Sequence, residues 1–104
     1  MGKHHITLYP SSRKNKKWAV RIGDKCTVHF GDSRYEDYTM HRDDQRKSNY
    51  LARHKSRENW RDKCTAGFWS RWLLWNKKSI AASIRHIQTK FGVTITKKRN
   101  APQK

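Results

Sequence analysis

The sequence predicts an α+β fold, in which a small antiparallel β-meander of about three strands packs against two or three helices. Two observations support this prediction. In the first third of the chain apolar residues alternate with polar ones, which is typical of half-buried strands. Further along they recur at helical spacing. Because 104 residues suffice for one domain, we expect a single domain over residues 1–96, followed by a basic C-terminal arm over 97–104.

A β-hairpin is expected over residues 17–30. A three-residue loop at Gly23 would place Ile22 opposite Cys26, and this register brings all six alternating apolar side chains to one face. Residues 4–9 alternate in the same way and form the expected third strand, which ends at Pro10. The stretch 11–17 is then a basic connecting loop.

Three helices are expected after the hairpin. The first, over residues 42–60, is highly charged. The second covers residues 66–75 with Thr65 as its cap, and the third covers residues 80–91 with Ser79 as its cap. Gly92 is well placed to end the third helix. Val93 and Ile95 alternate with threonines and could add a short strand.

The second of these helices, AGFWSRWLLW, is the most apolar stretch of the chain. Its large side chains cover most of the helix circumference, so we expect it to be nearly surrounded, either by the sheet or by a partner. The residues expected in this core or protein anchor are Phe68, Trp69, Trp72, Leu73 and Trp75.

The net charge of +17 is unevenly distributed. All eight acidic residues lie between Asp24 and Asp62, so residues 1–23 and 63–104 carry only basic charges. This segregation indicates a centre that neutralises itself and basic flanks that bind an acidic partner, which could be nucleic acid, an anionic membrane face or an acidic protein surface. The side chains expected to make this contact are Arg13, Lys14, Lys16, Lys17, Lys77, Lys78, Lys97, Lys98 and Arg99.

The cysteines and histidines predict neither a metal site nor a cofactor. Cys26 and Cys64 lie far apart, and no residues are spaced as CxxC or HxxxH. A reduced intracellular site of action is favoured, with a single disulfide as the alternative. No apolar run approaches the roughly 20 residues of a membrane span, and the start of the chain lacks a secretory signal.

A group of acidic residues and histidines in the centre raises the possibility of a nuclease. Its spacing matches no motif of known mechanics, and Arg and Lys are interleaved with it, so an ion-pair network is favoured and no enzymatic activity is predicted. The residues concerned are Asp37, His41, Asp43, Asp44, His54 and Glu58.

Residues 29–60, HFGDSRYEDYTMHRDDQRKSNYLARHKSRENW, and residues 65–77, TAGFWSRWLLWNK, resemble a small basic domain of unassigned function in nucleocytoplasmic large DNA viruses. The ordered series HFG, DYT, RHK and TAGFWSRWLLWN carries the resemblance, which brings no catalytic residues. It implies a virion component, such as a minor capsid or cement protein that bridges acidic surfaces of neighbouring capsid proteins through its basic flanks. The alternative is a nucleic-acid-binding protein that condenses or packages the viral genome.

Overall fold

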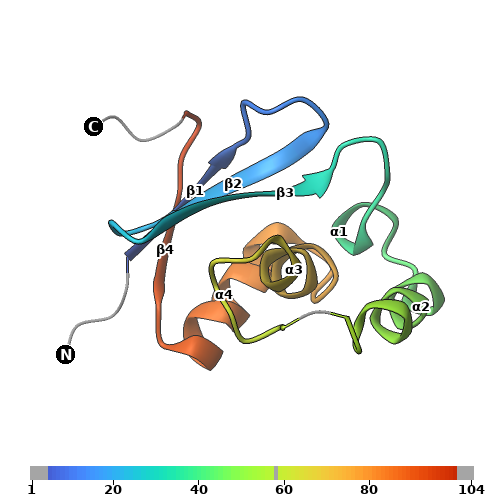
Figure 1. Ribbon diagram of the computed structural model, residues 1–104. Helices are drawn as coiled ribbons and strands as arrows, with labels where there is room; N and C mark the ends of the chain where they lie inside the picture. Colours follow the sequence, from blue (N-terminus) through green and yellow to red (C-terminus); the bar gives the residue numbers. More distant parts are fainter. Residues whose placement is uncertain (1–4, 58, 101–104) are drawn as a thin grey trace.

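The computed structural model describes residues 5–57 and 59–100. It confirms the predicted α+β class, because helices pack against one face of a curved four-stranded sheet (Figure 1). The strands are β1 (His5–Pro10), β2 (Lys16–Ile22), β3 (Cys26–Asp32) and β4 (Thr94–Lys97). The helices are α1 (Tyr38–His41), α2 (Asp44–His54), α3 (Ala66–Trp69) and α4 (Ile80–Phe91), and a π-helical turn, η1 (Ser70–Leu74), continues α3.

The strand order is β3-β2-β1-β4. The first three strands form the predicted antiparallel meander, and the hairpin has the predicted register, with Ile22 opposite Cys26 and Val20 opposite Val28. The fourth strand lies parallel to β1, so the sheet is mixed rather than purely antiparallel. A parallel neighbour is possible here because α4 carries the chain back along the sheet before β4 begins.

The helices differ from the prediction in three places. Helix α2 is shorter than the expected 42–60, and the short helix α1, which Asp37 caps, lies in a segment for which no helix or strand was predicted. The apolar segment after Thr65 changes from α-helix to a π-turn, in which the Trp75 N–H donates to the Ser70 carbonyl at 3.0 Å. Helix α4 has the predicted bounds and caps.

The core lies between the sheet and the helical layer formed by α3, η1 and α4. The indole of Trp69, which is fully buried, packs against Phe30 with ring centroids 6.1 Å apart. Gly31, the residue after Phe30, has a left-handed backbone conformation (φ +80°). A Cβ atom at position 31 would come within 2.9 Å of Leu74 Cδ1. The remaining buried members of this core are Ile6, Leu8, Val20, Ile22, Val28, Phe68, Leu73, Ile87, Val93 and Ile95.

The described residues between 33 and 62, called the helical excursion below, lie beyond the end of β3 and to one side of the sheet (Figure 1). We call the rest of the described chain the body. In the excursion, the buried apolar side chains are Tyr38 and Tyr50. The ring of Tyr50 stacks on Trp75 of the body, with centroids 4.3 Å apart and planes inclined by 2°.

Among the described residues, no helix has the length and apolar character that a membrane span requires.

Candidate acidic-partner interface

The parallel pairing of β4 with β1 brings the two basic flanks of the sequence to the same end of the sheet. Leu8 lies opposite Lys97, and its carbonyl accepts a hydrogen bond from the Lys98 N–H at 2.8 Å. Pro10, two residues further along β1, lies opposite Trp18 of β2. The basic β1–β2 loop therefore begins beside the C-terminal tail, although the two segments are at opposite ends of the sequence.

We call the resulting cluster the sheet-end surface. Its members are all exposed: Arg13, Lys14, Lys16, Lys97, Lys98 and Arg99. Lys97 Nζ lies 5.4 Å from the centroid of the half-buried Trp18 ring, which ties the tail to the sheet. Lys97 is the last residue of β4, whereas the C-terminal arm was expected from the sequence to begin at this residue.

The electrostatics of this end of the sheet are strongly positive. Partial burial, followed by the charges of Arg13 and Lys16, lowers the pKa of His29, whose Nδ1 lies 2.7 Å from Ser11 Oγ. The acidic residue Asp32 lies opposite Lys16, but both its oxygens accept hydrogen bonds from Arg34, which holds its pKa well below the usual value. Within the described chain, no ion pair engages the cations of the sheet-end surface.

Lys17, which the sequence placed in the partner-binding set, has an internal role instead. Its Nζ lies 2.6 Å from Oδ2 of Asp37, and only 16% and 4% of the two side chains are exposed. Asp37 also accepts from the Thr39 N–H and so caps α1. The pair therefore joins β2 to the helical excursion and offers little to a partner.

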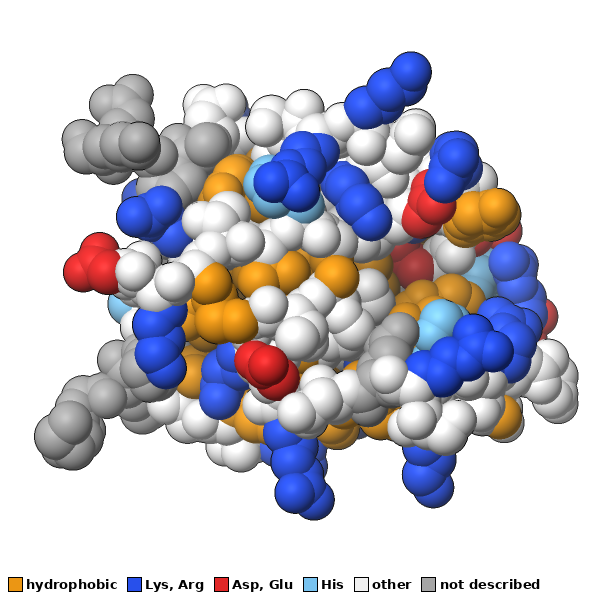
Figure 2. Space-filling model, in the orientation of Figure 1, with side chains coloured by type: hydrophobic (Ala, Val, Ile, Leu, Met, Phe, Trp, Pro, Cys, Tyr) orange, Lys and Arg blue, Asp and Glu red, His pale blue; other side chains and the backbone are white. Residues whose placement is uncertain are grey.

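The remaining predicted contacts, Lys77 and Lys78, are exposed in the turn between η1 and α4. Arg42 Nε donates to the Lys78 carbonyl at 3.1 Å, so this turn lies next to the end of α1. The structure thus divides the predicted set into a sheet-end group and a second pair at the helical layer. Figure 2 shows Lys and Arg side chains spread over the face it displays, with few Asp or Glu side chains between them.

The predicted anchor residues separate into two kinds. Phe68, Trp69 and Leu73 are fully buried, so they belong to the core and cannot contact a partner. Trp72 and Trp75 are half-buried. Trp75 stacks on Tyr50 and so holds the excursion against the body. Among the predicted anchor residues, Trp72 is therefore the half-buried one that does not hold the excursion in this way.

The central aspartates serve local structure. Asp43 caps α2 through the N–H groups of Gln45 and Arg46, and Asp44 accepts from the Tyr38 hydroxyl, which lowers the Asp44 pKa. Glu58 lies outside the described residues. Among the residues that are described, no three His, Cys, Asp or Glu side chains are grouped to hold a metal ion.

The ion-pair network expected from these residues is correspondingly small. The pairs that join described residues are Lys17–Asp37, Arg34–Asp32 and Arg46–Glu36. The last two are substantially exposed, and such pairs contribute little to stability. Most of the acidic side chains named above act as caps or hydrogen-bond acceptors, a role that their spacing in the sequence does not distinguish from ion pairing.

A cleft of about 650 Å³ separates the excursion from the body. The stacked pair Tyr50 and Trp75 lines it, together with the small residues Ala66 and Gly67 of α3. Cationic side chains from both sides also line it, namely Lys16, Lys17, Arg46 and Arg53. The cleft shows that few apolar contacts close the gap between the two regions.

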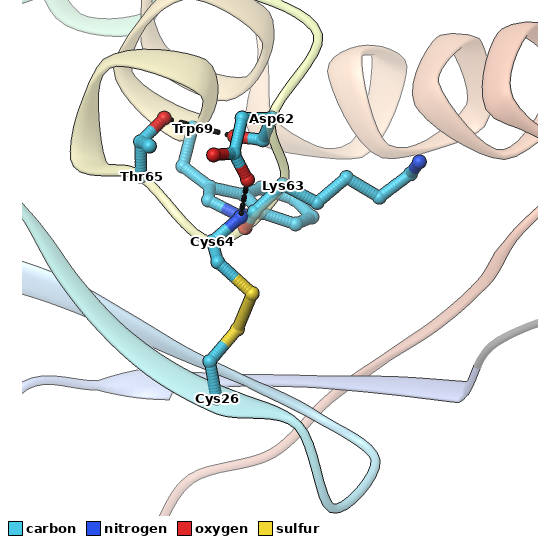
Figure 3. Close-up of a disulfide and its surroundings, with 6 residues drawn as sticks. All are labelled: Cys26, Asp62, Lys63, Cys64, Thr65 and Trp69. Atoms are coloured by element: carbon cyan, nitrogen blue, oxygen red, sulfur yellow. Dashed lines mark hydrogen bonds between the residues drawn. A yellow bond between two sulfur atoms is a disulfide. The ribbon is translucent and has the colours of Figure 1, made fainter.

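Cys26 and Cys64 form a disulfide, with Cα atoms 6.1 Å apart (Figure 3). The favoured expectation of reduced cysteines was therefore wrong, because folding places the start of β3 beside the segment that precedes α3. Asp62 accepts from the Cys64 N–H at 2.9 Å, and Trp69 Nε1 donates to the Lys63 carbonyl at 2.7 Å. These bonds fix the Cys64 side of the bridge, a proximity that sequence spacing could not reveal.

A family of unknown function (DUF5754) matches residues 6–54, which extend from β1 to the end of α2. The match covers slightly less than half of the chain, and the family's description carries no activity. No curated protein and no solved structure matches the chain.

Proposed function

We propose that this protein is a non-enzymatic structural component of a large DNA virus particle, a minor capsid or cement protein that bridges acidic surfaces of neighbouring capsid proteins. The observation that carries the proposal is the convergence of both basic flanks on the sheet-end surface. The viral setting rests on the resemblance of residues 29–60 and 65–77 described above.

The sheet-end surface suits a protein partner that presents carboxylates. Its cations come from two strands, a loop and a tail that backbone pairing holds together, so several of them can meet one acidic surface at once. A single exposed ion pair contributes about 0.2–1 kcal/mol, but several engaged together give appreciable affinity and select an acidic partner.

Bridging also needs a second contact, and the exposed pair Lys77 and Lys78 supplies one at the helical layer. The disulfide supports the proposed location, because such bonds persist in oxidising surroundings, which include the exterior of a released particle. The non-enzymatic character is supported by the use of Asp37, Asp43 and Asp44 in caps and hydrogen bonds.

Cosedimentation with the purified major capsid protein at about 0.15 M salt tests this proposal, since a Debye length near 8 Å leaves close contacts effective. The test variant replaces four cations of the sheet-end surface by glutamine: Lys14, Lys16, Lys97 and Lys98. The control variant removes the same charge from exposed positions elsewhere: Arg21, Lys25, Arg53 and Lys55.

We expect the sheet-end variant to bind at least about fourfold more weakly than the unmodified protein, because four lost pairs at roughly 0.2–1 kcal/mol each amount to about 0.8 kcal/mol or more. The control variant should retain most of the binding. Equal losses in the two variants would mean that net charge, not this surface, determines binding, and the proposal would be wrong.

A further inference from the structure

We propose that a second binding site, formed where α2, η1 and α4 meet, takes the phosphate groups of a nucleic-acid strand. None of its residues belongs to the sheet-end surface, and Lys77 is the one residue that it shares with the second contact proposed above. We call it the helical cation cluster; its members are Lys47, Arg71, Lys77, His86 and Lys90, with the half-buried rings of Trp60 and Trp72.

Arg71 is the centre of this cluster. Its guanidinium carbon lies 4.2 Å from the centroid of the Trp72 ring and 5.5 Å from that of Trp60. The π-turn allows Nη1 to donate to the Trp75 carbonyl at 3.1 Å, whereas Nε is buried and has no hydrogen-bond partner. No carboxylate in the described chain pairs with this side chain. Arg71 is therefore held in place without a carboxylate partner, so its positive charge is available to a bound anion.

Lys90 is a second cation on the same aromatic surface. Its Nζ lies 5.2 Å from the Trp72 centroid and 5.8 Å from that of Phe91. Lys63 approaches Phe91 as well, at 5.5 Å. Cations from η1, α4 and the segment before α3 thus gather around two neighbouring rings, whose centroids are 5.4 Å apart.

The polar side of the cluster is formed around Asn76 and His86. Asn76 Nδ2 lies 2.7 Å from His86 Nδ1, and Lys47 Nζ donates to the Asn76 carbonyl at 2.6 Å. Burial, and then the charges of Lys77, Lys90, Arg71 and Lys47, lower the pKa of His86. These four cations therefore share one small region, where their mutual repulsion costs free energy that a bound anion would relieve.

The combination of groups favours a nucleic-acid strand over an acidic peptide. Arginine presents a planar fork of donors that fits phosphate oxygens, and lysines around it track a charged backbone. The partly exposed indoles of Trp60 and Trp72 offer apolar surface on which bases can stack. A chain of carboxylates has no aromatic groups to place on this surface.

The dependence of binding on salt tests the site. A single-stranded DNA of about 20 nucleotides is titrated with the full-length protein, with a variant carrying Lys77→Gln and Lys90→Gln, and with a control carrying Lys25→Gln and Lys55→Gln. All four positions are exposed, and both variants lose the same charge. The slope of log K against log salt is negative, and each lost phosphate contact should reduce its magnitude by about 1.

We expect the magnitude of the slope to decrease by about 2 in the cluster variant and to be unchanged in the control. If the unmodified protein does not bind the strand at about 0.05 M salt, or if the two variants behave alike, the inference is wrong.

A second measurement identifies the class of ligand. The pKa of His86, followed by NMR of its ring protons, should rise when the DNA strand binds, because the phosphates offset the neighbouring cations. Polyglutamate of equal charge should bind more weakly and move this pKa less. An equal response to polyglutamate would overturn the assignment to nucleic acid, and no response to either polymer would overturn the site itself.

Discussion

The body and the helical excursion are held in different ways. In the body, a continuous apolar core joins the sheet to α3, η1 and α4. In the excursion, the buried apolar side chains are Tyr38 and Tyr50, and a cleft of about 650 Å³ lies between it and the body. Links from the excursion to the body include the Lys17–Asp37 pair, the Tyr50–Trp75 stack and the hydrogen bonds that Arg42 and Lys47 donate to backbone carbonyls of the body. The Cys26–Cys64 disulfide joins body residues on either side of the excursion and so holds its two ends together.

This difference follows from composition. The excursion contains most of the acidic residues and few large apolar ones, so burial cannot fix its position. Polar, aromatic and covalent links replace burial there. We therefore expect substitutions in the body to change global stability, and substitutions at the links between the two regions to change mainly the attachment of the excursion.

The largest effect should come from the core of the body. Leu73 is fully buried, and Leu73→Ala should lower the free energy of unfolding by about 2–5 kcal/mol, because it removes buried apolar volume and leaves a cavity. Leu51 of the excursion is half-buried, so Leu51→Ala should cost clearly less. Urea unfolding followed by tryptophan fluorescence measures both variants. Equal losses would contradict the division into a packed body and a weakly packed excursion.

The disulfide should have the next largest effect. It closes a loop of 38 residues, and the loss of that constraint on the unfolded chain amounts to roughly 4 kcal/mol. Replacing both cysteines by serine should therefore lower stability by up to this amount and make residues 33–62 the first site of limited proteolysis. A reducing agent should reproduce the effect in the unmodified protein and change nothing in the double variant. Cleavage that begins in the body would contradict the attachment role.

Breaking the buried ion pair should have a smaller effect. Asp37→Asn leaves the Lys17 ammonium near the protein interior without its counter-charge, and we expect a loss of about 1–3 kcal/mol. The double variant Lys17→Met and Asp37→Asn should recover part of this loss, because no charge is then left unpaired. Chemical denaturation of Asp37→Asn, of Lys17→Met and of the double variant measures the difference. A double variant as unstable as the sum of the two single variants would show that the pairing itself contributes nothing.

The smallest effect concerns pH. Burial and neighbouring cations lower the pKa of His29 and of His86 in the folded protein, so the unfolded chain binds more protons just below pH 6.5. Stability should therefore decrease as the pH falls from 7.5 to 5. The lowered pKa values of Asp32 and Asp44 affect stability only nearer pH 4, since both carboxyls titrate near 3.8 when unfolded. A variant with His29→Gln and His86→Gln should show a flatter pH dependence of the unfolding midpoint, and an unchanged dependence would contradict these shifts.

The sequence predicted the elements whose pattern is local. The alternation around Val20 and Val28 set the hairpin register, and the caps Ser79 and Gly92 set the bounds of α4. It did not predict that β4 lies parallel to β1, because strand pairing across the whole chain depends on how the helices pack. Nor did it predict the short helix α1, since four residues give no measurable periodicity.

The candidate site was predicted by residue type but not by position. The excess of basic residues in both flanks identified every member of the sheet-end surface, whereas its assembly from two distant segments required the pairing of β1 with β4. Lys17 was assigned to the wrong role, because nothing in the local sequence shows that Asp37 folds back onto it. Arg71 was overlooked, since a single cation in an apolar helix gives no sign of the rings that will surround it.

Zero-length cross-linking of intact particles tests the central claim most directly. A carbodiimide joins lysines to carboxylates that are in contact, and mass spectrometry identifies the linked peptides. We predict cross-links from Lys14, Lys16, Lys97 and Lys98 to acidic residues of capsid proteins, at higher yield than from exposed lysines outside the sheet-end surface such as Lys25 and Lys55. If the sheet-end lysines form no such links, or if the protein leaves opened particles with the genome instead of the shell, the proposed bridging role is contradicted.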